Sequence, residues 1–231
     1  SAWSLVFDGF DPEHEGVRES LCTLGNGYFA TRGAIPGTRA DDVHYPGTYL
    51  AGGYNRLRTD IVGRTVENED LVKLPDWLVL GFRIAGQAWF DVRKIKLLSY
   101  RQEFDLKRGM LLRSIRFEDD EGRRSLLRER RLVSMVDMHL GAVESSLTAE
   151  NWSATVTVRS AIDGQVTNTG AKLYRKFNNQ HLEPLGGELI GNDGVQLRVR
   201  TSQSRLELAQ VVRTRAFVDG RPLDCARRVT E

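Results

Sequence analysis

The feature that most constrains this chain is a two-residue alternation of apolar and polar side chains. Residues 152–159 alternate strictly, residues 195–200 do the same, and residues 115–118 continue the pattern. Successive side chains of a strand point to opposite faces, so such a segment buries one face and solvates the other. Residues 77–84 carry apolar side chains on both faces, which predicts a strand buried on both sides. The chain therefore predicts a fold built from β-strands.

Turn signals separate these apolar runs at short intervals. They contain glycine, asparagine or aspartate, which accept the positive φ of tight hairpins, and lie at residues 85–87, 119–122, 163–164, 192–194 and 219–220. The spacing predicts roughly ten to twelve strands in an all-β, antiparallel sandwich or barrel.

Only a few segments depart from the strand pattern. No helical stripe of three or more turns is present, and residues 19–24 fit a short helical turn, a strand or a loop equally well. Residues 178–187 are interpreted as a long polar loop.

The charge balance excludes some classes of partner. The net charge is +2, from 33 basic and 31 acidic residues, whereas nucleic-acid proteins usually show a clustered basic face. The densest arginine cluster, residues 123–131, is interrupted by Glu129 and by leucines. On a strand these arginines are expected at rim or solvated positions on both faces. We therefore expect no nucleic-acid partner.

Cysteine and apolar content favour a cytoplasmic protein. Cys22 and Cys225 lie far apart and are interpreted as two buried free thiols of a reducing compartment. No run approaches the roughly 18 apolar residues of a membrane span, and no secretory signal opens the chain. No metal and no cofactor are expected, because no metal-ligand spacing joins the histidines His14, His44, His139 and His181.

Two irregular stretches, residues 18–33 and residues 45–77, mix aromatic with polar side chains. Sugar recognition uses this mixture, since an aromatic face covers the C–H side of a pyranose while amides and carboxylates bond its hydroxyls. The alternative is that the aromatics are core residues and that Asn26-Gly27 is a hairpin turn.

A set of motifs runs along the chain, within these stretches and outside them. The motifs are Trp3, Phe7-Asp8-Gly9, Glu19-Ser20-Leu21, Leu24-Gly25-Asn26-Gly27-Tyr28, Thr31-Arg32-Gly33, residues 49–52, residues 71–77 and residues 98–106. In order and spacing they resemble the N-terminal domain of glycoside hydrolase family 65, which includes maltose, trehalose and kojibiose phosphorylases. The resemblance covers essentially the whole chain, and Asp76 stands where many members have asparagine.

The resemblance implies a galactose-mutarotase-like super-β-sandwich. Residues 1–231 would form the single N-terminal domain of a longer enzyme, whose (α/α)6 barrel carries the catalytic glutamate and the phosphate site. The barrel is absent from this chain, so no catalytic residue is expected here. The parent is expected to cleave α-glucosidic disaccharides with inversion of configuration at the anomeric carbon, as a phosphorylase or a hydrolase. In a phosphorylase, inorganic phosphate is the nucleophile. Expected partners are the C-terminal barrel, the disaccharide, phosphate and a second copy in a homodimer.

Two sets of residues are singled out. Substrate-pocket or domain-interface candidates are Tyr45, Tyr49, Tyr54, Asn55, Arg56, Pro75, Asp76 and Trp77. Structural residues of the motif are Glu19, Asn26, Gly27, Tyr28 and Arg32, with Asn26-Gly27 expected in a turn and Arg32 expected to pair with Glu19.

Two alternatives stay open. One is a stand-alone aldose mutarotase, in which His139 or His181 would work with Glu144 or Glu183 as acid and base. The other is an autonomous carbohydrate-binding module, which would show a row of exposed aromatics on one sheet face.

Overall fold

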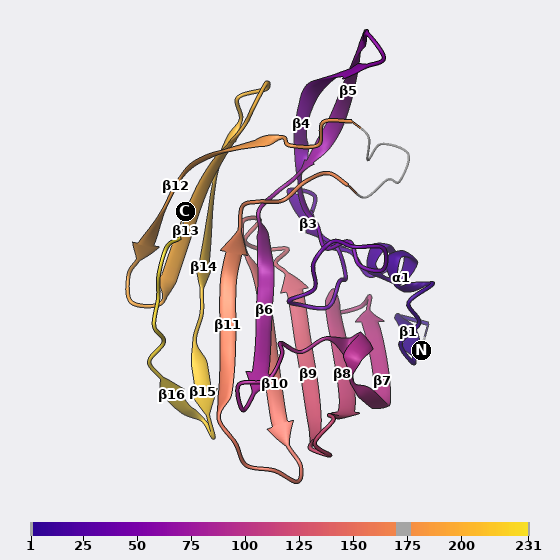
Figure 1. The fold of residues 1–231 in the computed structure, drawn as a ribbon, viewed down its shortest axis with the longest axis vertical. Helices are drawn as coiled ribbons and strands as arrows, with labels where there is room; N and C mark the ends of the chain where they lie inside the picture. The colour runs from indigo at the N-terminus through magenta and orange to yellow at the C-terminus, as the bar shows by residue number, and fades with distance from the viewer. Residues whose placement is uncertain (1, 170–176, 231) are drawn as a thin grey trace. The chain divides into compact units, whose positions relative to one another are not determined.

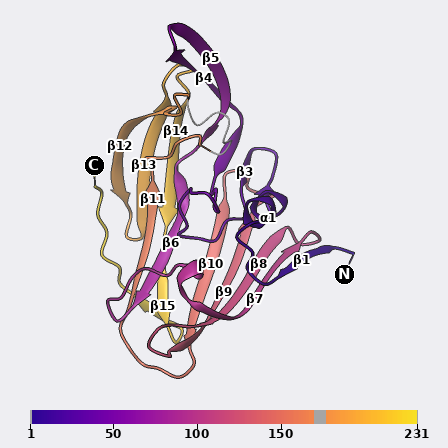
Figure 2. The same ribbon diagram turned by 45° about the vertical axis from the view of Figure 1, so that its right-hand side comes forward.

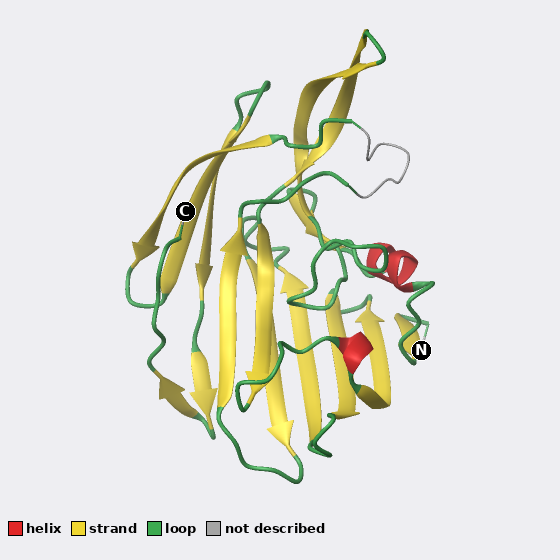
Figure 3. Cartoon of the chain, viewed as in Figure 1, coloured by secondary structure: helices red, strands yellow, loops and turns green. Residues whose placement is uncertain are grey.

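The computed structural model describes residues 2–169 and 177–230, and most of its regular structure is β-strand (Figures 1 and 3). The chain forms two compact units. Unit 1 comprises residues 1–47 and 81–158, and unit 2 comprises residues 48–80 and 159–231. The elements of the described residues are β1 (Ser4–Asp8), α1 (Glu15–Leu21), β2 (Leu24–Gly25), β3 (Phe29–Thr31), β4 (Thr48–Ile61), β5 (Arg64–Lys73), β6 (Asp76–Ile84), η1 (Val92–Lys94), β7 (Lys96–Asp105), β8 (Met110–Glu118), β9 (Arg124–Val133), β10 (Gly141–Ala149), β11 (Val156–Asp163), β12 (Leu182–Ile190), β13 (Gly194–Thr201), β14 (Glu207–Arg213), β15 (Ala216–Val218) and β16 (Arg221–Leu223).

Unit 1 is organised around a five-stranded antiparallel sheet in the order β1-β7-β8-β9-β10. Strand β8 alternates as the sequence predicts, with Leu111, Ile115 and Phe117 buried on one face. Two apolar clusters pack there, one around Ile115 and Phe117 and the other around Leu111 and Cys22. The same buried face of β8 also carries Arg113, so this core has an ionic component.

Helix α1 lies at one end of this sheet (Figures 1 and 2). Its buried residues are Glu15 and Glu19, one helical turn apart, whereas Val17 and Leu21 are more than half exposed. This distribution reverses the usual amphipathic pattern, in which the apolar stripe faces the core. The hydrophobic pattern therefore could not predict α1, and residues 19–24 contain only its last turn.

Unit 2 contains a three-stranded antiparallel sheet, β12-β13-β14, and the hairpins β4–β5 and β15–β16. Its core groups Val72, Val166, Leu182 and Val199. The long β4–β5 hairpin closes at residues 62–63, both of which have positive φ, as tight hairpin turns require.

The all-β, antiparallel fold class is confirmed, and sixteen strands are present in the described part of the chain. The expectation that residues 45–77 are irregular is wrong, since this segment contains β4, β5 and the start of β6. The buried face of β4 carries Gly53, Asn55 and Leu57, so its alternation is not hydrophobic. The loop expected at residues 178–187 is also wrong from Leu182 onward, because β12 accommodates Pro184 and two glycines beside a bulge.

Both cysteines are free thiols, as expected, but only Cys22 is buried and Cys225 is exposed. None of the helices among the described residues is long and apolar enough to cross a membrane.

Candidate functional site

A row of polar side chains crosses three adjacent strands on the buried face of the unit 1 sheet. Gln102 on β7 lies opposite Arg113 on β8, which lies opposite Glu129 on β9. Arg113 donates to Glu129, and its Nη2 donates to Gln102 Oε1 at 2.9 Å and to the Gly33 carbonyl at 2.7 Å. Burial by itself lowers the pKa of Arg113, but Glu129, Tyr100 and Glu15 together outweigh it and raise that pKa above its ordinary value. This arginine therefore stays charged inside the core.

A second buried arginine lies two residues along β9 from Glu129. Arg131 Nε donates to Glu129 Oε1 at 2.9 Å, and its terminal nitrogens donate to the carbonyls of Arg32 and Ala34 at 3.0 and 2.6 Å. The sequence placed Arg131 at a rim or solvated position, but the residue is 1% exposed. The prediction is wrong because Glu129 and the backbone carbonyls satisfy the guanidinium. Glu129 thus joins two arginines that together hold the backbone of residues 32–34.

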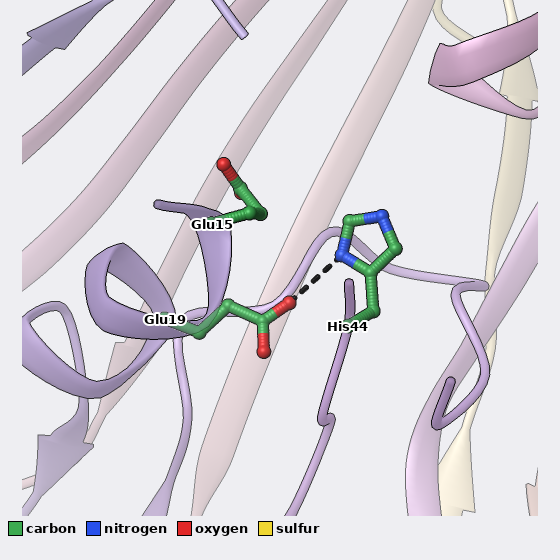
Figure 4. Close-up of side chains that lie close together, drawn as sticks. All are labelled: Glu15, Glu19 and His44. Atoms are coloured by element: carbon green, nitrogen blue, oxygen red, sulfur yellow. Dashed lines mark hydrogen bonds and ion pairs between the residues drawn. The ribbon is translucent and has the colours of Figure 1, made fainter. Parts of the chain in front are cut away.

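The buried face of α1 extends the network to the segment after Gly33 (Figure 4). Glu19 Oε1 accepts a hydrogen bond from His44 Nδ1 at 2.9 Å, and Glu19 Oε2 accepts one from Tyr45 N at 2.8 Å. A carboxylate only accepts, so the shared proton belongs to Nδ1 of the imidazole. Glu19 therefore fastens residues 44 and 45 to the helix.

Glu15 lies beside this pair and has a different environment. Its carboxylate is fully buried, and its oxygens have no hydrogen-bond partner among the described residues. Arg18 Nη1 lies 3.9 Å from Glu15 Oε2. Burial raises the pKa of Glu15, and the positive charge of Arg113 opposes that rise.

Ligand atoms of Glu15, Glu19 and His44 lie within 4.8 Å of one another, so these three side chains could in principle hold a cation. The surroundings fit an ion-pair network better. Both oxygens of Glu19 already accept hydrogen bonds, and guanidiniums of Arg18 and Arg32 lie 3.9 Å from Glu15 and Glu19. Further positive charge at this point is unfavourable. The expectation of no metal stays a prediction.

Arg32 lies beside Glu19 and Tyr45. Its Nη2 lies 3.9 Å from Glu19 Oε2, so the predicted ion pair is present. Its Nε donates to the Tyr45 carbonyl at 2.8 Å, and its guanidinium lies 5.5 Å from the centre of the Tyr45 ring. Gly33 next to it packs so closely on Cys22 that an added Cβ would lie 2.7 Å from the Cys22 Cβ.

Asn26 and Gly27 form the predicted turn, with Gly27 at φ +86°. Asn26 Oδ1 accepts from the amides of Tyr28 and Phe29 at 3.0 and 3.1 Å. Asn26 Nδ2 also donates to the carbonyls of residues 134 and 138, at 2.7 and 3.0 Å. This second connection, to the loop between β9 and β10, was not predicted, because nothing local in the sequence indicates a contact more than 100 residues away.

The substrate-pocket or interface candidates are divided between the two units. Tyr45 belongs to unit 1 and the others belong to unit 2. Asn55 is 1% exposed and is an internal cross-link: its Oδ1 accepts from the amides of Gln203 and Ser204, and its Nδ2 donates to Ser202 Oγ at 3.1 Å.

The neighbours of Asn55 on β4 face solvent. Arg56 is exposed and pairs with Glu69 at 2.6 Å, and Tyr54 is half-exposed. Tyr49, nearer the start of the strand, is partly buried.

The candidates around residue 76 are mostly internal. Pro75 and Asp76 are buried, and Asp76 Oδ1 accepts from the Leu78 amide at 2.9 Å. Trp77 is partly buried, and its Nε1 donates to Thr48 Oγ1 at 3.1 Å.

The histidines and glutamates considered for a mutarotase have other partners among the described residues, and His139 packs on the Tyr28 ring. His181 is 1% exposed, its Nδ1 lies 3.0 Å from Asn55 Nδ2, and its Nε2 lies 3.3 Å from Asp70 Oδ2. Burial lowers the pKa of His181, and Asp70 opposes that change. Both glutamates considered as its partners bind arginines: Glu183 pairs with Arg200 and Arg205, and Glu144 pairs with Arg130.

These features describe an all-β domain whose central charged groups hold its own backbone. A solved structure provisionally assigned as a kojibiose phosphorylase, from the human microbiome, has the same fold: the TM-score is 0.81 at 20% identity, over 95% of this chain and 28% of that one. Residues 5–231 match the model of the glycosyl hydrolase family 65 N-terminal domain, so the chain belongs to this family.

Relatives in the same family are much longer. An uncharacterized glycosyl hydrolase of Mycobacterium tuberculosis H37Rv is 48% identical over 98% of this chain, which spans 17% of that relative. A kojibiose phosphorylase of Caldanaerobacter subterraneus is 27% identical over 90% of the chain and 25% of its own length. A trehalose 6-phosphate phosphorylase of Lactococcus lactis is 28% identical over 91% of the chain and 26% of its own length.

The buried ion pairs lead to a prediction about stability. Glu129→Gln removes the counter-charge of two buried guanidiniums, so the free energy of unfolding should fall by about 3–5 kcal/mol. Urea denaturation measures this change. Glu144→Gln on the neighbouring strand is the matched control, since its pair with Arg130 is about 60% exposed and should contribute less than about 1 kcal/mol. Equal losses in the two variants would contradict the assignment.

The carboxyl of Glu15 leads to a prediction about pH. The pKa of Glu15 is higher in the folded state than the ordinary 4.5, so the folded state binds the proton more tightly than the unfolded state. The free energy of unfolding therefore falls as pH rises from 4.5 through the folded pKa. Glu15→Gln removes this loss. The variant should be more stable than the wild type at neutral pH, and the difference should shrink toward about pH 4.

Thermal unfolding across this pH range measures the effect of Glu15→Gln. Glu13→Gln, an exposed change just before the same helix, is the control and should leave the pH profile unchanged. A constant offset of Glu15→Gln at every pH would disprove the role assigned to Glu15.

Proposed function

We propose that this chain is the non-catalytic N-terminal domain of a cytoplasmic family 65 enzyme that cleaves an α-glucosidic disaccharide with inversion, by phosphorolysis or hydrolysis. The supporting observation is that the central charged groups of the domain are buried. Glu15, Glu19 and Glu129 are at most 4% exposed, whereas a general acid must come within about 3 Å of the substrate atom that it protonates. These three carboxyls are therefore unsuited to that role, and the proposal places the chemistry in another part of the polypeptide.

The length of the relatives also supports placing the catalytic residues outside this domain. Phosphorylases that match this chain carry about three quarters of their length outside the match. In the parent enzyme, an (α/α)6 barrel supplies the glutamate that protonates the leaving oxygen, and phosphate or water attacks the opposite face of the sugar. The domain described here supports that barrel and contributes contacts to a second copy in a homodimer.

The candidate residues of unit 2 divide into two roles within this proposal. Tyr54 and Arg56 are exposed on β4 and are available to line a sugar pocket or an interface, as aromatic and charged side chains do. Asn55, Asp76 and Pro75 are buried and hold the backbone that presents Tyr54, Arg56 and Trp77.

The isolated chain should be inactive, because the proposed catalytic acid lies elsewhere. Incubation with trehalose, maltose or kojibiose in phosphate buffer should release neither glucose nor glucose 1-phosphate. In the parent enzyme, Trp77→Ala should lower kcat/KM by roughly tenfold by displacing interface or pocket groups. Thr157→Ala, at an exposed strand position, should leave kcat/KM unchanged. Phosphate-dependent turnover by the chain alone would disprove the proposal.

A further inference from the structure

The loop between β9 and β10, residues 134–140, presents large apolar side chains to solvent in unit 1. Met135 is 78% exposed, Val136 is 100% exposed, and Met138 and Leu140 are each about half exposed. Four of the seven residues of one loop are therefore exposed hydrophobics. A single exposed apolar side chain needs no explanation, whereas a contiguous group of them marks an interaction surface.

The loop's own polar groups hold it in one conformation. Ser134 Oγ accepts from the amides of Val136 and Asp137 at 3.3 and 3.0 Å, and Asp137 Oδ1 accepts from the His139 amide at 3.1 Å. The Leu140 amide donates to the Asp137 carbonyl, and the Ser134 amide donates to the Leu140 carbonyl. Because these bonds satisfy much of the backbone, the outward surface offers mainly apolar side chains.

The turn at Asn26 fixes where this loop lies. Asn26 Nδ2 binds the carbonyls of Ser134 and Met138 at 2.7 and 3.0 Å. The Tyr28 ring meets the His139 ring edge to face, with centroids 4.5 Å apart. The motif through which the chain resembles its family therefore positions the apolar loop. A rigid surface of this kind binds with little loss of conformational entropy.

We propose that residues 134–140 are a docking surface for the catalytic part of the same polypeptide. The proposal rests on the proposed function, because it takes as partner the portion that family 65 relatives carry beyond the match, 74–83% of their length. A covalently attached partner is present at high effective concentration, so a small apolar surface suffices. The surface that receives the loop is apolar, and the two methionines adapt to its shape because their side chains are flexible and polarizable.

Methionine oxidation tests this contact directly. The chain has three methionines; Met135 and Met138 lie in the loop, and Met110 lies in β8. Mild peroxide treatment followed by peptide mass spectrometry should show Met135 and Met138 oxidising roughly tenfold more slowly in the full-length enzyme than in the isolated chain. Met110 is the internal control and should oxidise equally in both. Equal oxidation of the loop methionines in the two proteins would overturn the proposal.

A matched pair of variants identifies the partner surface. Val136→Asp should restore the oxidation of Met138 in the full-length enzyme, because a carboxylate is costly in an apolar contact. Val62→Asp, at a valine that is 99% exposed in the β4–β5 turn, should leave Met138 protected. The same effect from both variants would overturn the proposal. So would loop protection in the isolated chain that grows with protein concentration, which would assign the surface to a second copy.

Activity separates this proposal from the proposed function. An active full-length enzyme with unprotected loop methionines would overturn the docking surface alone. A full-length protein with protected methionines that releases no sugar from α-glucosidic disaccharides would support the docking surface and count against the proposed activity.

Discussion

Glu129 lies between two buried arginines, and much of unit 1 depends on that arrangement. Arg113 and Arg131 bind this one carboxylate and then reach the carbonyls of Arg32, Gly33 and Ala34. Burying such charges is costly unless each is paired and hydrogen-bonded. The pairing is what allows an irregular segment to be anchored on the face of a regular sheet.

The motif residues Glu19 and Arg32 bind the backbone of the same domain. Glu19 fastens residues 44 and 45 to α1, and Arg32 binds the backbone of Gly16 and Tyr45 from the other side. Their donors and acceptors are used within the domain. A domain built in this way supplies a rigid support, and its exposed loops and hairpins are the parts free to meet a sugar or another domain.

The alternating strands with an apolar buried face could be predicted from the sequence, whereas polar burial could not. The strand predicted at residues 152–159 is wrong for residues 152–155, because β11 begins at Val156 and residues 156–159 are exposed. Alternation located β8 and β13, and glycine with asparagine or aspartate located the hairpin turns that follow β8, β12 and β15. Helix α1 was missed because its buried positions are Glu15 and Glu19, which hydrophobic periodicity cannot detect. Arg131 was misplaced because its partners come from residues about 100 positions away. The family resemblance identified the motifs, but it did not predict the long-range contacts that their residues make.

The arginine network predicts that residues 32–34 belong to the same cooperative unit as the five-stranded sheet. Native-state amide hydrogen exchange, followed by NMR, tests it most directly. The Gly33 amide, which donates to the Glu19 carbonyl at 2.8 Å, should exchange as slowly as that of Ile115 in β8, because opening the segment breaks the arginine network. A Gly33 amide that exchanges at the rate of a surface loop, while Ile115 stays protected, would contradict the claim.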